Sequence, residues 1–243
     1  MTPIATLVAT ILAAPAPVLV FDTCSLLDLF RRDSTRQQPR VPPDEIQAAA
    51  HVLQSLAAQP KALHLVVPEL VPGEYRDHAD RIEGEFEGWF LSHDENRQWL
   101  AEAARSLALA LPAQLAVHPF GIHAVCRKLA EDLLANAVVL ARDQSCLDRA
   151  VDRLVAKRRP SHKKEIKDSM NLEQSLELSR QLQSAGFTAA RVFVSSNTND
   201  FAASAESSAA HPELQGEFAA VGLEYFTSLR SAVGSLRSRG ELP

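Results

Sequence analysis

Three short apolar runs stand out along the chain, each bounded by polar or acidic residues. They cover residues 18–21, 64–68 and 190–195. Runs of this length with such boundaries are typical of buried strands. Between them, apolar residues recur at intervals of three and four, which predicts helices packed on one side. We expect helices over residues 4–13, 44–56, from 69 onward, 168–185, 212–221 and from 227 onward. The alternation predicts an α/β fold with a central parallel sheet flanked by helices.

The middle of the chain departs from this alternation. From residue 77 to residue 155 the spacing is mostly helical, and Pro112, Pro119 and Gly121 divide the stretch into several helices. We expect residues 77–155 to form a long helical insertion, with Trp89, Phe90 and Trp99 as core anchors. Residues 202–243 are expected to extend a single domain that spans 1–243, with an edge strand over 223–226.

Composition narrows the classes of protein that remain. The net charge of −5 provides no overall attraction to nucleic acid. Three cysteines without a C-x-x-C pair fit a reducing cytoplasm better than a disulfide framework. The apolar start has no basic residue before it and is broken by Pro15 and Pro17, which disfavours both a signal peptide and a membrane span. We therefore expect a cytoplasmic protein without a membrane association.

One segment is basic in spite of the acidic total. Between residues 149 and 167, eight Lys and Arg residues stand against Asp152 and Glu165. Such a local cluster can bind phosphates, and the alternative is a solvated charge run. We take five of its members as candidate nucleic-acid contacts: Arg158, Arg159, Lys163, Lys164 and Lys167.

Acidic and amide side chains follow the predicted strands or open the predicted helices. They are Asp22, Glu74, Asp168, Asn197 and Asp200. The carboxyl ends of parallel strands share one edge, so these residues can converge. Converging carboxylates either take up protons or bind a hard cation, and oxygen ligands favour Mg²⁺ or Mn²⁺ over Zn²⁺. Open carboxylate sites for such ions serve phosphate chemistry.

Four motifs in this order resemble the PIN-domain nucleases, in particular their larger bacterial branch. They are Leu19-Val-Phe-Asp-Thr23, Pro68 with Glu74, Lys167-Asp168, and Val194-Ser-Ser-Asn-Thr-Asn-Asp-Phe201. The resemblance covers residues 17–76 and 160–201. It implies a Rossmann-like fold and a Mg²⁺- or Mn²⁺-dependent endoribonuclease that hydrolyses RNA.

The resemblance also implies roles for individual residues. Asp22, Glu74 and Asp168 would form the catalytic and metal-binding acids. The fourth acidic position falls on Asn197 by spacing, with Asp200 as the nearest carboxylate, and Ser195 or Ser196 would support the loop. RNA is the implied partner, and the family also allows an antitoxin or other regulatory partner and a homodimer.

Three alternatives remain open from the sequence. Cys24 could serve as a thiol nucleophile, although a small buried residue explains it as well. A phosphatase with an aspartyl nucleophile would need a second Asp where Cys24 stands. A PIN-like scaffold that binds RNA or a protein without cleavage is favoured by Asn197 and by the acidic net charge.

Overall fold

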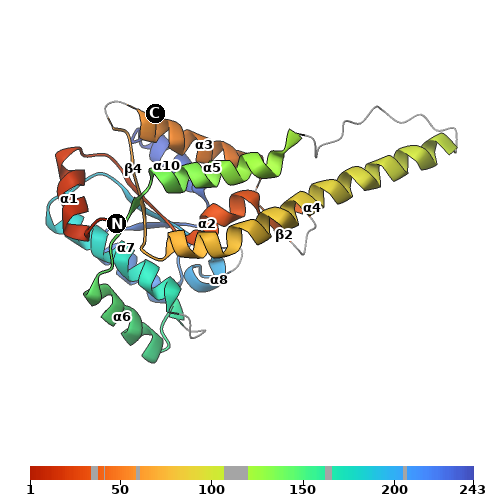
Figure 1. The fold of residues 1–243 in the computed structure, drawn as a ribbon. Helices are drawn as coiled ribbons and strands as arrows, with labels where there is room; N and C mark the ends of the chain where they lie inside the picture. The colour runs from red at the N-terminus through yellow and green to blue at the C-terminus, as the bar shows by residue number, and fades with distance from the viewer. Residues whose placement is uncertain (34–37, 41, 59–60, 107–119, 162–165, 205–206) are drawn as a thin grey trace.

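The computed structural model describes residues 1–33, 38–40, 42–58, 61–106, 120–161, 166–204 and 207–243. Within these residues, five strands form one parallel sheet in the order β5-β4-β1-β6-β7 (Figure 1). The strands are β1 (Val18–Phe21), β4 (His64–Val67), β5 (Val138–Val139), β6 (Arg191–Val194) and β7 (Glu224–Phe226). The expected α/β architecture with a central parallel sheet is therefore confirmed.

Helices cover both faces of the sheet. One layer contains α3 (Pro43–Ala57), α4 (Val71–Ser106), α5 (Ile122–Asn136) and α10 (Leu229–Ser238). The other layer contains α1 (Ile4–Ala13), α6 (Gln144–Val155), α7 (Lys167–Ser184) and α9 (Pro212–Ala220). Shorter elements complete the described chain: α2 (Thr23–Leu27), the 3₁₀ helix η1 (Asp28–Phe30), β2 (Arg32–Asp33), β3 (Gln38–Pro39) and α8 (Thr198–Phe201).

The central strand β1 explains why its sequence is apolar throughout. Successive side chains of a strand point to opposite faces of the sheet. Leu19 and Phe21 pack into the first layer, while Val18 and Val20 pack into the second. Because both faces are covered, all four residues are buried, which is the pattern of a parallel sheet inside two helical layers.

Helix α4 is the longest element described. Its 36 residues span about 54 Å at 1.5 Å per residue. Its first half packs on the core through Tyr75, Ile82, Phe86 and Phe90, and its second half extends away from the body (Figure 1). Trp99 lies on this extending half with 68% of its surface exposed, so the expectation that it anchors the core is wrong.

One further feature differs from the sequence-based picture. The stretch 77–155 includes β5, which pairs with β4 at one edge of the sheet, so this stretch contributes a strand as well as helices. A run of two residues is too short for its periodicity to be recognised. At the other edge, β7 confirms the strand expected over 223–226 and pairs with β6. Among the described residues, no helix combines the length and the apolar character that crossing a membrane requires.

Candidate functional site

The order of the strands defines a switch point between β1 and β6. Along the chain, the strands next to β1 on one side, β4 and β5, come before β6 and β7 on the other. The connections that follow β1 and β6 therefore leave in opposite directions, and open α/β sheets bind ligands in the crevice at the carboxyl ends of two such strands. Asp22 directly follows β1, and Ser195 directly follows β6.

Asp22 is held by three donors at this end of the sheet. Its side chain is 1% exposed. The backbone N–H of Thr23 donates to Oδ1 at 2.6 Å, and the hydroxyl of Ser195 donates to Oδ2 at 2.7 Å. The amide Nδ2 of Asn171 donates to Oδ1 over 3.4 Å. These contacts fix the carboxyl group in one orientation.

Glu74 is connected to Asp22 through Thr23. Glu74 lies in the first turn of α4, and its Oε2 accepts a hydrogen bond of 2.7 Å from the Thr23 hydroxyl. Its Oε1 lies 3.5 Å from the Nζ of Lys167 at the start of α7. Thr23 therefore donates to both carboxylates, from its backbone and from its side chain.

Asn197 connects the other two acids. Its Nδ2 lies 3.3 Å from Oδ2 of Asp168, in the first turn of α7, and 2.8 Å from Oδ2 of Asp200 in α8. Its backbone N–H donates to the hydroxyl of Ser195 at 3.2 Å, and that hydroxyl donates in turn to Asp22. Asn197 and Asp200 thus lie at the same site.

The pKa of Asp22 reflects its burial and the acid that lies near it. Burial raises the pKa of its carboxyl, and the negative charge of Glu74 raises it further. The donors Ser195, Thr23 and Asn171 oppose the shift, and the resulting pKa is about 6. A carboxylate in this position is stabilised by a proton or by a cation.

Cys24 does not have the environment of a nucleophile. Burial raises the pKa of its thiol, and the nearby carboxylates of Asp22 and Asp28 raise it further. A reactive cysteine needs a lowered pKa and an electropositive surrounding. These contacts disfavour the thiol mechanism.

The basic segment divides into structural and exposed members. Arg149 and Arg153 pair with the buried Glu173, and Arg153 also pairs with Glu217. The guanidinium of Arg159 donates to the backbone carbonyl of Asn199.

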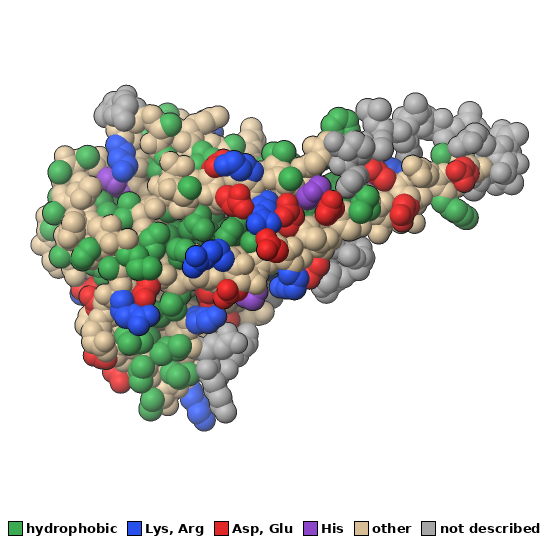
Figure 2. Space-filling view, in the orientation of Figure 1, with side chains coloured by type: hydrophobic (Ala, Val, Ile, Leu, Met, Phe, Trp, Pro, Cys, Tyr) green, Lys and Arg blue, Asp and Glu red, His purple; other side chains and the backbone are tan. Residues whose placement is uncertain are grey.

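Of the candidate nucleic-acid contacts, Arg158 and Lys167 are exposed, while Lys163 and Lys164 lie outside the described residues. On the face shown in Figure 2, Lys and Arg side chains alternate with Asp and Glu over α4 and α5. Arg127 of α5, for example, pairs with Asp80 and Glu83 of α4. An anion-binding surface would therefore have to be local.

Two polar residues of the site were not recognised from the sequence. Thr23 belongs to the strand-end motif without a role of its own there, and no motif of the sequence includes Asn171. A signal existed for Asn171, because it follows Asp168 by three positions on a predicted helix and such residues share a face. Ser196, one of the expected supporting residues, has a hydroxyl that is buried without a hydrogen-bond partner among the described residues.

The donor set consists of oxygen atoms from carboxylates and amides. Within the described residues, no group of three or more His, Cys, Asp and Glu side chains is arranged so that it could hold a metal ion. Thr23 connects Asp22 to Glu74, and Asn197 connects Asp168 to Asp200. Such a set could hold a hard divalent cation once the carboxylates approach each other. The buried, unpartnered Oδ1 of Asn171 fits this possibility.

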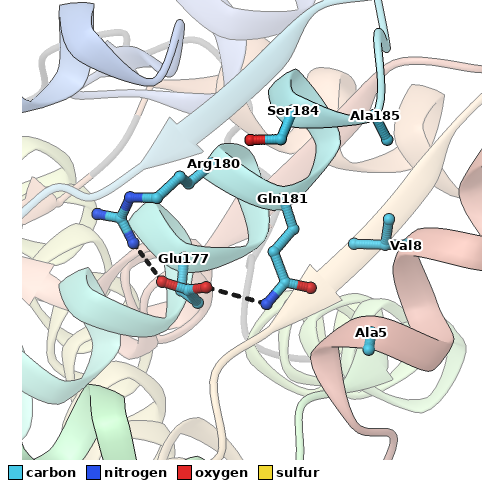
Figure 3. Close-up of a pocket in the computed structure, with 7 residues that line it drawn as sticks. All are labelled: Ala5, Val8, Glu177, Arg180, Gln181, Ser184 and Ala185. Carbon is cyan, nitrogen blue, oxygen red and sulfur yellow. Dashed lines mark hydrogen bonds and ion pairs between the residues drawn. The ribbon is translucent and has the colours of Figure 1, made fainter.

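Away from this site, a hollow lies between α1 and the C-terminal half of α7 (Figure 3). Its volume is about 530 Å³. It is lined by Ala5, Val8, Glu177, Arg180, Gln181, Ser184 and Ala185. The carboxylate of Glu177 accepts hydrogen bonds from both Arg180 and Gln181, so the charges here are paired with each other. This hollow offers less chemistry than the acidic site at the strand ends.

Fold and site together define an α/β protein with an acidic, amide-containing site at the switch point of a parallel sheet. No protein-family model, no curated protein and no solved structure matches this chain. The function therefore has to be inferred from the site itself.

Proposed function

We propose that this chain is a PIN-like, Mg²⁺- or Mn²⁺-dependent endoribonuclease that hydrolyses phosphodiester bonds of RNA. The observation that supports it best is the convergence of four acids from separate segments on one edge of the sheet. Thr23 and Asn197 link Asp22, Glu74, Asp168 and Asp200 by hydrogen bonds. Lys167 lies beside Glu74, and a group of carboxylates at one site favours binding of a divalent cation.

In the proposed site, each side chain has a distinct role. Asp22 and Asp168 would hold the cation, with Glu74 as a further ligand or as the group that would orient a water molecule. Asn197 and Asp200 complete the oxygen donors, and Ser195 and Thr23 hold Asp22 in place. A bound Mg²⁺ or Mn²⁺ would supply Lewis acidity and lower the pKa of water. Arg158, Arg159 and Lys167, with Lys163 and Lys164, are the proposed contacts to the RNA backbone.

Other aspects of the proposal come from the family resemblance alone. These are an antitoxin or other regulatory partner and a homodimer, whereas the proposed cytoplasmic location rests on the three cysteines without a C-x-x-C pair. A matched pair of RNA and DNA oligonucleotides of one sequence would test the preference for RNA.

The test of catalysis is metal-dependent cleavage of an end-labelled single-stranded RNA. The wild-type chain should cleave with Mn²⁺ and stop when EDTA is added. Loss of a residue that only supports a metal ligand reduces activity by about 10- to 100-fold. Asp22→Asn and Asp168→Asn change proposed ligands themselves, so their activity should fall by more than this. The exposed Asp148, which is bonded to Gln144 on α6, provides the control Asp148→Asn with unchanged activity. Cleavage by Asp22→Asn at the wild-type rate would refute the mechanism.

A second candidate function is a non-catalytic scaffold that binds RNA or a protein. The observation in its favour is the amide of Asn197 at a position where the resemblance calls for a carboxylate. A scaffold should not gain thermal stability from Mn²⁺, whereas binding at 100 times Kd would stabilise the folded state by about 2.7 kcal/mol. A thermal shift titration with MnCl₂ separates the two functions.

A further inference from the structure

Asn171 contacts Asp22 of the site, although the function proposed above gives it no role. It is fully buried on α7, one turn after Asp168. Its Nδ2 lies 3.4 Å from Oδ1 of Asp22. Only the amide nitrogen can donate to a carboxylate, so this contact also determines the orientation of the amide.

The contacts of Asp22 are distributed unequally between its two oxygens. A carboxylate oxygen offers about two acceptor positions. Oδ1 accepts from the N–H of Thr23 and from Asn171, so both of its positions are used. Among the described residues, Oδ2 accepts from the hydroxyl of Ser195. Among the described residues, Asp22 therefore has an open acceptor position on Oδ2. Asn171 contributes to this difference between the two oxygens by donating to Oδ1.

The second polar atom of Asn171 is unsatisfied. Within the described part of the chain, its Oδ1 is buried and has no hydrogen-bond partner. A buried amide oxygen without a partner costs about 1–3 kcal/mol.

Other buried polar side chains of the same helix are satisfied. The amide of Gln174 accepts from the N–H of Glu69 and donates to the carbonyl of Ala141. The hydroxyls of Ser175 and Ser179 each donate to a backbone carbonyl. The unsatisfied oxygen of Asn171 is therefore not a general property of the buried polar residues of this helix, and it lies on the residue of α7 that contacts Asp22.

We propose that Asn171 is a further residue of the metal site, a proposal that rests on the function proposed above. Its Nδ2 positions Asp22 and leaves Oδ2 as the oxygen with an open acceptor position. Its Oδ1 is a neutral oxygen ligand for the cation, in addition to the acids. A hard cation binds amide oxygens as well as carboxylates.

The test measures Mn²⁺ affinity of the full chain by calorimetry and by the loss of the free Mn²⁺ signal in electron paramagnetic resonance. Asn171→Leu removes both polar atoms at a similar side-chain volume, and its Mn²⁺ affinity should fall by at least about 10- to 100-fold. Asn171→Asp keeps an oxygen ligand and should bind Mn²⁺ at least as tightly as the wild type.

Gln174→Leu is the matched control, because it also removes a buried amide from α7. It leaves the Glu69 N–H and the Ala141 carbonyl without their partner, so it should reduce stability more than Asn171→Leu and leave Mn²⁺ affinity unchanged. Asn171→Leu should therefore lose more Mn²⁺ affinity than Gln174→Leu, and Gln174→Leu should lose more stability than Asn171→Leu.

Three results would overturn the inference. Equal Mn²⁺ affinity of Asn171→Leu and wild type would mean that Asn171 is structural. Equally weak binding by Asn171→Asp and Asn171→Leu would exclude Oδ1 as a ligand. Absence of Mn²⁺ binding by the wild type would refute the proposed function itself, and the inference with it.

Discussion

At the scale of single residues, Asp22 combines burial with an unfavourable neighbouring charge. Its pKa is about 6 in the folded chain, against 3.8 for an ordinary aspartate. Between these two values the folded state holds a proton that the unfolded chain has released. Stability contributed by this group is therefore highest below pH 4 and is lost as the pH rises towards and above 6.

The first prediction concerns the metal-free protein. Asp22→Asn removes the charge, so in EDTA at pH 8 it should be more stable than the wild type, by up to about 3 kcal/mol for a shift of about two pKa units. At pH 4 the wild-type carboxyl is neutral and the difference should be small. Urea denaturation at pH 4, 6 and 8 measures it. A stability difference that stays constant with pH would contradict the assigned charge state.

The sequence identifies the acids of this site better than the residues that arrange them. Asp22, Glu74 and Asp168 stand at predicted strand ends and helix starts, where a residue's position can be read from periodicity. Asn171 lies within a helix among other buried polar residues. Its role depends on the distance to Asp22, 149 positions away in the sequence, and no local pattern encodes that distance.

At the scale of elements, α6, α7 and α9 are joined by a buried ion-pair network. Arg153 of α6 is 2% exposed and pairs with Glu173 of α7 and Glu217 of α9. From the sequence, Arg153 belongs to a basic cluster that could bind phosphates. A run of arginines looks the same whether it faces solvent or carboxylates, because the partners come from other helices.

The second prediction tests this structural role. Arg153→Met leaves Glu173 buried with Arg149 as its remaining salt-bridge partner among the described residues, and should cost about 3–5 kcal/mol. The double variant Arg153→Met/Glu173→Leu should recover part of that loss. Arg158→Ala, a change at an exposed residue of the same segment, should stay within about 0.5 kcal/mol of wild type. Guanidinium denaturation measures these stabilities. Equal stability of Arg153→Met and Arg158→Ala would refute the structural role of Arg153.

At the scale of the whole molecule, the proposed RNA binding would have to work against a net charge of −5. A local group of cations can still bind a strand if each contact displaces a condensed counterion. Arg158 and Lys167 are both exposed. Lys61, also exposed, precedes the amino end of β4, at the edge of the sheet opposite to the site.

The third prediction compares these positions. Arg158→Ala and Lys167→Ala, each in an Asp22→Asn background that prevents cleavage, should weaken binding of a single-stranded RNA. Each should also reduce the slope of log K against log salt by about 0.7. Lys61→Ala should change neither quantity. Fluorescence anisotropy at several salt concentrations provides both, and an equal effect of Lys61→Ala would mean that binding is not localised at the strand-end site.

Whole-molecule features were predictable to different degrees. The parallel α/β class follows from alternating strands and helices, and the three strands recognised first are the three central ones of the sheet. The extension of α4 beyond the body was not foreseen, because helical periodicity gives the length of a helix and not what it packs against. The position of β5 depends on its pairing with β4, which two apolar residues do not reveal.

The central position of β1 has a consequence for biosynthesis. Its neighbour β6 comes late in the chain, and the hydrogen bond between Asp22 and Ser195 spans 173 positions. During translation, Asp22 leaves the ribosome long before Asp168 and Asn197 have been made. The hydrogen-bonded site therefore forms only when most of the polypeptide has been released from the exit tunnel. If the chain cleaves RNA as proposed, the growing polypeptide could not cleave the messenger that encodes it until synthesis is nearly complete.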